Sequence, residues 1–208
     1  MAIEFLLRIK TMPAYTTISW EFAKRDREGL VSRFYAALID ESISFDGVFP
    51  WGCDEKMPFE EIVSWNQMKL DGDFTIGFTQ DVSHDYRQIL MRVMPFSECR
   101  IFLVNSKANI KFNCIVPEDE ITVENCEPLL QGCLRTWFHL PVLAIETYGE
   151  IGANVGSMRI SSGQPPSASL FAIVDRECHT YESYPEFDRT LLGRGCLLRR
   201  KGSSIGDH

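Results

Sequence analysis

The feature that most restricts the fold is a succession of four short apolar segments between residues 73 and 116. The segments are DFTIGFT (73–79), RQILMRVM (87–94), RIFLVN (100–105) and NIKFNCIV (109–116). Each is typical of a β-strand, and turn-rich pieces such as QDVSHD separate them. Strands with such short links pair antiparallel, because a parallel crossover needs about a dozen residues or more. This region therefore predicts an antiparallel meander.

Three helices are expected beside this sheet. Residues 26–40 place apolar side chains at helical spacing on one side and polar ones on the other. A second helix is expected to start at Pro58 and to run to about Leu70, where the sequence DGD ends it. A third is expected from about Cys126, with Asn125 as its cap.

Further strands are expected at residues 2–10, 142–148 and 169–175, whereas residues 16–22 are either a hairpin partner or a loop. Residues 41–57 contain glycine and proline without a sustained period, which indicates a long loop. The predicted class is α+β, with about three helices and a mostly antiparallel sheet of six to eight strands. One domain with one core is expected over residues 1–198, followed by a polar tail at 199–208.

The composition is that of an ordinary globular domain, with 208 residues, 45% hydrophobic and 24% charged. No apolar run approaches the roughly 18 residues needed to cross a membrane. The N-terminal segment MAIEFLLRIK has neither a basic leader nor a small-residue cleavage site, so it does not resemble a signal peptide. The seven cysteines are an odd number and none form a C-x-x-C pair. We therefore expect a cytoplasmic protein that does not engage the membrane.

The charge is unevenly distributed along the chain. Residues 40–73 contain nine acidic and two basic residues, and account for −7 of the total net charge of −8. A second acidic stretch, PEDEITVENCE at 117–127, has five acids and no base. Such fields repel nucleic acid and attract cationic partners. Direct binding to nucleic acid is therefore disfavoured.

Large aromatic side chains are interleaved with the carboxylates of the first acidic stretch. They are Phe45, Phe49, Trp51, Phe59 and Trp65. A mixture of this kind suits a recognition surface, where buried aromatics anchor a partner and charges steer its approach. The alternative is that the aromatics fill the core and the acids keep the surface soluble. We favour the alternative for each aromatic alone, and the interface for the segment as a whole.

Asp81, His84 and Asp85 lie close enough in sequence to suggest a general acid–base or metal cluster. Asp and Ser also favour turns, because their side chains bond to nearby backbone groups. The link between two predicted strands needs such a turn, and no further ligand stands at a suitable spacing. We interpret the cluster as a turn.

Other candidate chemistry is weaker. Cys178 could be a nucleophile, but the adjacent His179 would point to the opposite face of an extended segment, so a base such as His139 would have to approach across the fold. Cys126 and Cys133 are seven residues apart and suit core packing in a helix. The glycines near 149–156 lack both the G-x-G-x-x-G spacing and a following helix. No cofactor or metal is predicted.

The stretches EEIVSWNQMKLDGDF and FTQDVSHDYRQ, together with the acidic character and the absence of a catalytic motif, resemble bacterial immunity proteins. These proteins are paired with polymorphic or type VI secreted effectors, several of which are nucleases. The resemblance implies a protein partner, a cognate toxin, whose active site this chain would block.

The binding residues that we predict all belong to the first acidic stretch. They are Asp46, Phe49, Trp51, Asp54, Glu55, Glu60 and Glu61. The competing hypothesis is a small hydrolase or transferase that uses His84 with Asp81 or Asp85, or a site built on Cys178.

Overall fold

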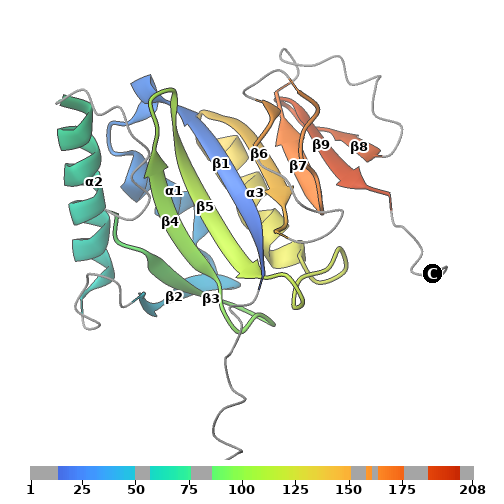
Figure 1. Cartoon of the computed structure of the whole chain (residues 1–208), viewed down its shortest axis with the longest axis horizontal. Helices are drawn as coiled ribbons and strands as arrows, with labels where there is room; N and C mark the ends of the chain where they lie inside the picture. The colour runs from blue at the N-terminus through green and yellow to red at the C-terminus, as the bar shows by residue number, and fades with distance from the viewer. Residues whose placement is uncertain are drawn as a thin grey trace, which may run out of the picture.

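The computed structural model describes residues 14–49, 57–75, 86–150, 158–160, 164–175 and 187–201. Its centre is a nine-stranded sheet in the order β2-β3-β4-β5-β1-β6-β7-β9-β8, and every strand pair in it is antiparallel (Figure 1). The strands are β1 Tyr15–Ala23, β2 Ile43–Val48, β3 Ile89–Val93, β4 Arg100–Asn105, β5 Asn109–Pro117, β6 Val142–Tyr148, β7 Phe171–Val174, β8 Phe187–Leu191 and β9 Cys196–Arg200.

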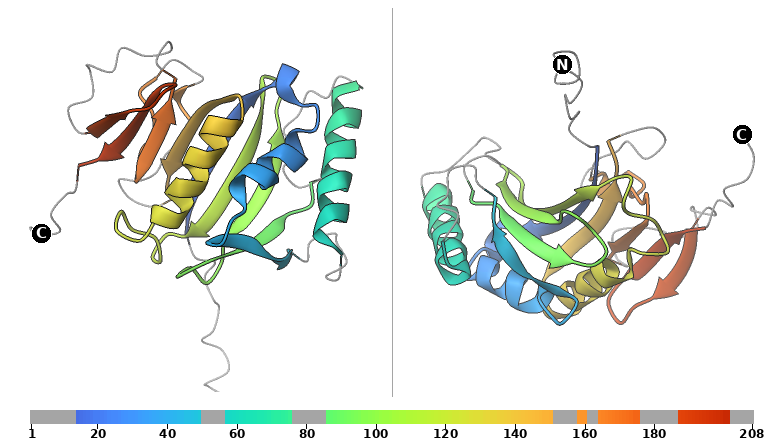
Figure 2. Two further views of the ribbon diagram at one scale, coloured as in Figure 1. Left: turned by 180° about the vertical axis from the view of Figure 1, so that it is seen from behind. Right: turned by 90° about the horizontal axis from the view of Figure 1, so that it is seen from below.

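The helices lie in the order α2, α1, α3 along one side of this sheet (Figure 2). They are α1 Leu30–Leu38, α2 Phe59–Thr75 and α3 Glu127–His139, and a short 3-10 helix, Lys24–Asp26, precedes α1. The α+β class, the three helices and the antiparallel meander β3-β4-β5 are confirmed. The strand number is higher than the predicted six to eight, because β2, β8 and β9 were not anticipated.

The main core lies between the helices and the sheet. Strand β1 alternates, so that Ile18, Trp20 and Phe22 face this core and are fully or almost fully buried. On α1, the ring of Phe34 stacks on the ring of Phe112 from β5, with centroids 3.9 Å apart. The ring of Phe34 also meets the edges of Trp20 and Phe22, so these large apolar side chains pack α1 against the central strands.

A second, smaller core lies on the opposite face of the sheet. In β7, Phe171 and Ile173 belong to the main core, whereas Ala172 and Val174 belong to the second. Successive side chains of a strand point to opposite faces, so this alternation places the two cores on either side of the same strands. The sequence predicted one core, whereas the structure has two clusters of buried apolar residues, one on each face of the sheet.

A long loop was predicted over residues 41–57, but residues 43–48 form strand β2. Residues 50–56 of the predicted loop lie outside the described residues. A β-bulge between Phe45 and Gly47 shifts the pairing with β3, and Gly47 has a φ of 140°. The bulge interrupts the alternation of buried and exposed side chains, so the segment has no period of two in its sequence.

Helix α2 corrects the prediction that DGD ends the helix at residue 70 and that a strand begins at 73. The helix continues through Gly72 to Thr75. The hydroxyl of Tyr86 donates to Asp73 at 2.7 Å, and Lys69 contacts the same carboxylate. The bond from Tyr86 and the i,i+4 ion pair within the helix both favour the extra turn, against the roughly 1 kcal/mol that glycine costs inside a helix.

Two further corrections concern element ends. The N-cap of α3 is Cys126, whereas the Asn125 side chain accepts from the backbone N–H of Thr122 and so does not cap the helix. Strand β9 runs to Arg200, beyond the predicted start of the polar tail. The predicted strand at residues 2–10 and the second part, 76–79, of the predicted strand 73–79 lie outside the described residues.

Candidate protein-binding surface

Asp46 is the extra residue of the β2 bulge, and its side chain is not free. It forms an ion pair with Arg92 of the neighbouring strand β3. Both side chains are exposed, which makes this a weak surface pair. The pair nevertheless lowers the negative field at the position where the sequence predicted an acidic binding residue.

Phe49 follows β2 and packs back onto the protein. The guanidinium of Arg100 lies 4.1 Å from the centre of its ring, and its backbone N–H donates to the carbonyl of Gln88 at 3.1 Å. Phe45 and Phe59 also contact each other, with ring centroids 5.1 Å apart, and pack against the main core. These described aromatics therefore contribute to the fold, as the alternative reading expected. Trp51, Asp54 and Glu55 lie outside the described residues.

Glu60 and Glu61 occupy the first turn of α2, and both are exposed. Carboxylates are favourable at this end of a helix, because the unbonded backbone N–H groups give it a partial positive charge. Neither side chain has an ion pair or hydrogen bond within the part of the chain that the structure describes. They are the binding residues from the sequence prediction that remain exposed and available.

The acidic stretch as a whole is more neutralised than the sequence predicts. Four of its acids are paired with bases, and three of those bases come from other parts of the chain. The pairs are Asp40–Arg135, Asp46–Arg92, Asp71–Arg27 and Asp73–Lys69. The uneven charge along the sequence therefore does not produce an unneutralised acidic face over the described part of residues 40–73. Its described acids without an ion pair are Glu41, Glu60 and Glu61, and two of these three lie at the start of α2.

An apolar groove of about 540 Å³ lies between α1 and α2, next to Glu60. On one side it is lined by Ser32, Tyr35 and Ala36 of α1 and by Ile39, the C-cap of this helix. From α2 it is lined by Phe59, Glu60, Val63, Ser64, Gln67 and Met68. The groove exists because Ser32, Ala36 and Ser64 are too small to fill the outer seam between the helices. Met68 at its edge is 63% exposed, which is high for a large apolar side chain.

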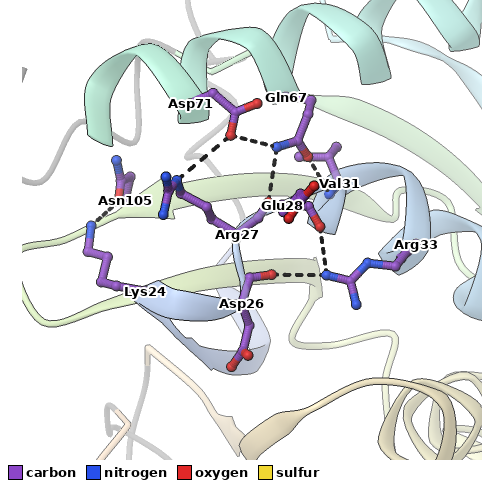
Figure 3. Close-up of polar contacts among 9 residues, drawn as sticks. All are labelled: Lys24, Asp26, Arg27, Glu28, Val31, Arg33, Gln67, Asp71 and Asn105. Atoms are coloured by element: carbon purple, nitrogen blue, oxygen red, sulfur yellow. Dashed lines mark hydrogen bonds and ion pairs between the residues drawn. The ribbon is translucent and has the colours of Figure 1, made fainter. Parts of the chain in front are cut away.

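Gln67 holds the two walls of the groove together (Figure 3). Its carbonyl oxygen accepts from the backbone N–H of Val31 in the first turn of α1 at 2.9 Å, and its amide donates to the carbonyl of Arg27 at 3.0 Å. Gly29, the N-cap of α1, provides no side-chain bond, so Gln67 caps α1 from another helix. Arg27 also reaches Asp71, one turn further along α2, with 4.0 Å between Nε and Oδ1. These contacts join the start of α1 to α2 at one end of the groove.

The residues of the competing enzyme hypothesis, Asp81, His84, Asp85, Cys178 and His179, lie outside the described residues. His139 is described, and is exposed at the end of α3. Cys126 and Cys133 are buried, as expected for core residues, and burial raises the pKa of both thiols. Within the described ranges, no group of three or more His, Cys, Asp or Glu side chains could hold a metal ion.

Sequence analysis missed a buried carboxylate on the other face of the sheet. Glu146 in β6 is fully buried and accepts hydrogen bonds from the backbone N–H groups of Arg159, Ile160 and Ser167, at 2.7 to 3.1 Å. Burial raises its pKa, and these amide bonds lower it by less. Glu146 thus holds the segments around residues 160 and 167 against the sheet, which is a structural role.

No family model matches the sequence, and a search of curated proteins gives no match either. The described part of the chain contains no helix that is long and apolar enough to cross a membrane. The features of the described surface that bear on function are the two carboxylates at the start of α2 and the groove beside them.

Proposed function

We propose that this chain is a binding protein that neutralises a cognate secreted toxin by covering the toxin's active site. The observation that carries the proposal is the pair Glu60 and Glu61, which are exposed and without partners among the described residues, at the end of an apolar groove. A toxin that cleaves nucleic acid needs a basic cleft, and carboxylates next to an apolar contact area are complementary to such a cleft.

The other predicted binding residues contribute unequally to the proposed binding surface. Trp51, Asp54 and Glu55 come shortly before α2 in the sequence, and the proposal includes them. Asp46 and Phe49 contribute less, since a cationic partner would have to compete with Arg92 for Asp46 and with Arg100 for Phe49. Most of the electrostatic attraction is therefore assigned to Glu60 and Glu61.

The test is to isolate the tagged chain from its native cells, identify the protein that accompanies it and assay that protein's toxic activity. A stoichiometric amount of the chain is expected to abolish the activity. The double variant Glu60→Lys/Glu61→Lys is expected to associate more slowly and with a weaker salt dependence, because its steering charge is reversed.

The matched control is Asp119→Lys/Glu124→Lys, which makes the same change of charge at exposed positions in the second acidic stretch. It should associate nearly as fast as the wild type. If it slows association as much as the α2 variant does, net charge and not the start of α2 governs binding. If the accompanying protein keeps its full activity in the complex, neutralisation is refuted.

A further inference from the structure

The groove between α1 and α2 has the form of a helix-binding site. On α1 its outer residues are Ser32 and Ala36, four residues apart, and Ile39 follows as the C-cap of the helix. On α2 they include Ser64 and Met68, also four residues apart. Such spacing places each row along one helix face, so the groove runs lengthwise between the helices. From Glu60 to Met68 it extends for about 12 Å, given a rise of 1.5 Å per residue. This length matches about two turns of a third helix.

The chemistry of the groove sets the character of its occupant. Six of the ten lining side chains are apolar or aromatic, and Glu60 is the only charged one among them. Glu61 adds a second carboxylate at the same end. Two full negative charges exceed the partial positive charge of roughly half a unit at the start of a helix, so this end of the groove stays negative. A fitting occupant therefore has an apolar face and a basic end.

We propose that the groove binds an amphipathic α-helix of the partner, whose apolar residues at positions i, i+4 and i+7 fill it and whose Lys or Arg side chains lie beside Glu60 and Glu61. This inference rests on the proposed function, because it identifies the part of the toxin that the chain holds. Helix-in-groove recognition uses just such anchors, spaced along one helix face.

Charge argues against two other occupants. A second copy of this chain also has a net charge of −8 and an acidic α2 end, so two copies repel each other at low salt. An anionic membrane surface is repelled for the same reason. A partner helix with basic residues is attracted.

The test uses synthetic peptides and the full chain, labelled with nitrogen-15, so it does not depend on the toxin. The probe is a 14-residue peptide of Leu and Lys with the leucines on one helical face. One comparison peptide replaces Lys by Glu, and another has the same Leu and Lys residues in an order without an apolar face. The Leu–Lys peptide is expected to shift amide resonances of α1 and α2, and to bind at least about tenfold more tightly than either comparison peptide.

Variants separate the groove from general acidity. Ala36→Phe fills the groove from α1 and Ser64→Phe fills it from α2, and both positions are exposed, so the fold should survive. Each is expected to abolish the shifts in the groove. Glu60→Gln/Glu61→Gln should weaken binding about threefold to tenfold at low salt, the range for two exposed charge pairs. Asp119→Asn/Glu124→Gln, the matched control, should not change it.

Several outcomes would overturn the inference. These are shifts located away from α1 and α2, unchanged binding in both groove-filling variants, or equal binding of the Leu–Glu or reordered peptide. None of them bears on neutralisation, which is measured with the native partner. Conversely, peptide binding in the groove would stand even if the native partner kept its activity, so the two proposals can fail separately.

Discussion

Glu146 is a carboxylate that the fold encloses completely, and its ionisation should affect stability. Its pKa is raised by burial, so between the ordinary carboxyl pKa and the raised value the folded state keeps a proton that the unfolded state has lost. The free energy of unfolding then falls as pH rises through this window. The measurement is urea unfolding of wild type and Glu146→Gln at pH 4 to 8. The free energy of unfolding of the wild type minus that of the variant should fall as pH rises and then level off.

Glu120 provides a control of opposite sign. Its carboxylate accepts hydrogen bonds from the Ser97 hydroxyl and backbone N–H, and these bonds lower its pKa. The stability that Glu120 contributes is present above the ordinary carboxyl pKa and is lost as pH falls. The free energy of unfolding of the wild type minus that of Glu120→Gln should therefore rise with pH. A difference that rises with pH for Glu146→Gln as well would mean that the three backbone amides outweigh burial.

The sequence located individual residues better than it described their surroundings. Glu146 was placed correctly in a strand, but its partners Arg159, Ile160 and Ser167 come from segments 13 to 21 residues away. Likewise, Arg92 lies 46 positions from Asp46 and pairs with it through the register of β2 and β3. A count of charges along the chain does not show which residues become neighbours in the sheet. It therefore gave residues 40–73 a strong negative charge, although the fold places Arg92 and Arg135 beside two of these acids. Glu60 and Glu61 remained exposed.

At the scale of elements, the contact between α1 and α2 depends on Gln67. Gln67→Ala removes the acceptor for the Val31 N–H and the donor to the Arg27 carbonyl. Loss of a capping bond costs about 0.5–2 kcal/mol, so the free energy of unfolding should decrease by about that amount. The amide of Val31 should also exchange its hydrogen faster. Ser64→Ala, an exposed neighbour on α2, is the control. Unchanged exchange at Val31 in Gln67→Ala would contradict the capping role.

The elements that the sequence predicted well are those with uninterrupted local patterns. Strands β4 and β6 match their predicted ranges because short apolar runs end at clear breaks. Strand β2 was missed because its bulge breaks the alternation of buried and exposed residues. The predicted end of α2 was too early because the sequence DGD favours a helix end, and the bond between Asp73 and Tyr86 cannot be read from the local sequence. Strand β8 is an edge strand with four exposed residues in succession, so it has no alternation to detect. The α1–α2 groove depends on how two helices pack, which no local pattern encodes.

At the scale of the whole molecule, the two cores share strands β6, β7 and β9, so they should unfold together. Ala144 and Ile145 of β6 belong to different cores, and so do Leu197 and Leu198 of β9. A loss of packing on one face must therefore loosen the strands that support the other face. Leu198 is fully buried in the second core, so we expect Leu198→Ala to lower the free energy of unfolding by about 2–5 kcal/mol.

The decrease in the free energy of unfolding of Leu198→Ala should be the same by two measurements of urea unfolding. Two of the four tryptophans, Trp20 and Trp137, are buried in the main core, so fluorescence is sensitive to the unfolding of that core. Far-UV circular dichroism reports on the backbone as a whole. Coincident transitions indicate one cooperative unit. Leu191→Ala, at a position 66% exposed on β8, is the control and should change stability by less than about 0.5 kcal/mol. If the circular dichroism of Leu198→Ala instead shows an early transition without a change in fluorescence, then β7, β9 and β8 unfold as a separate unit, and the expectation of a single domain is wrong.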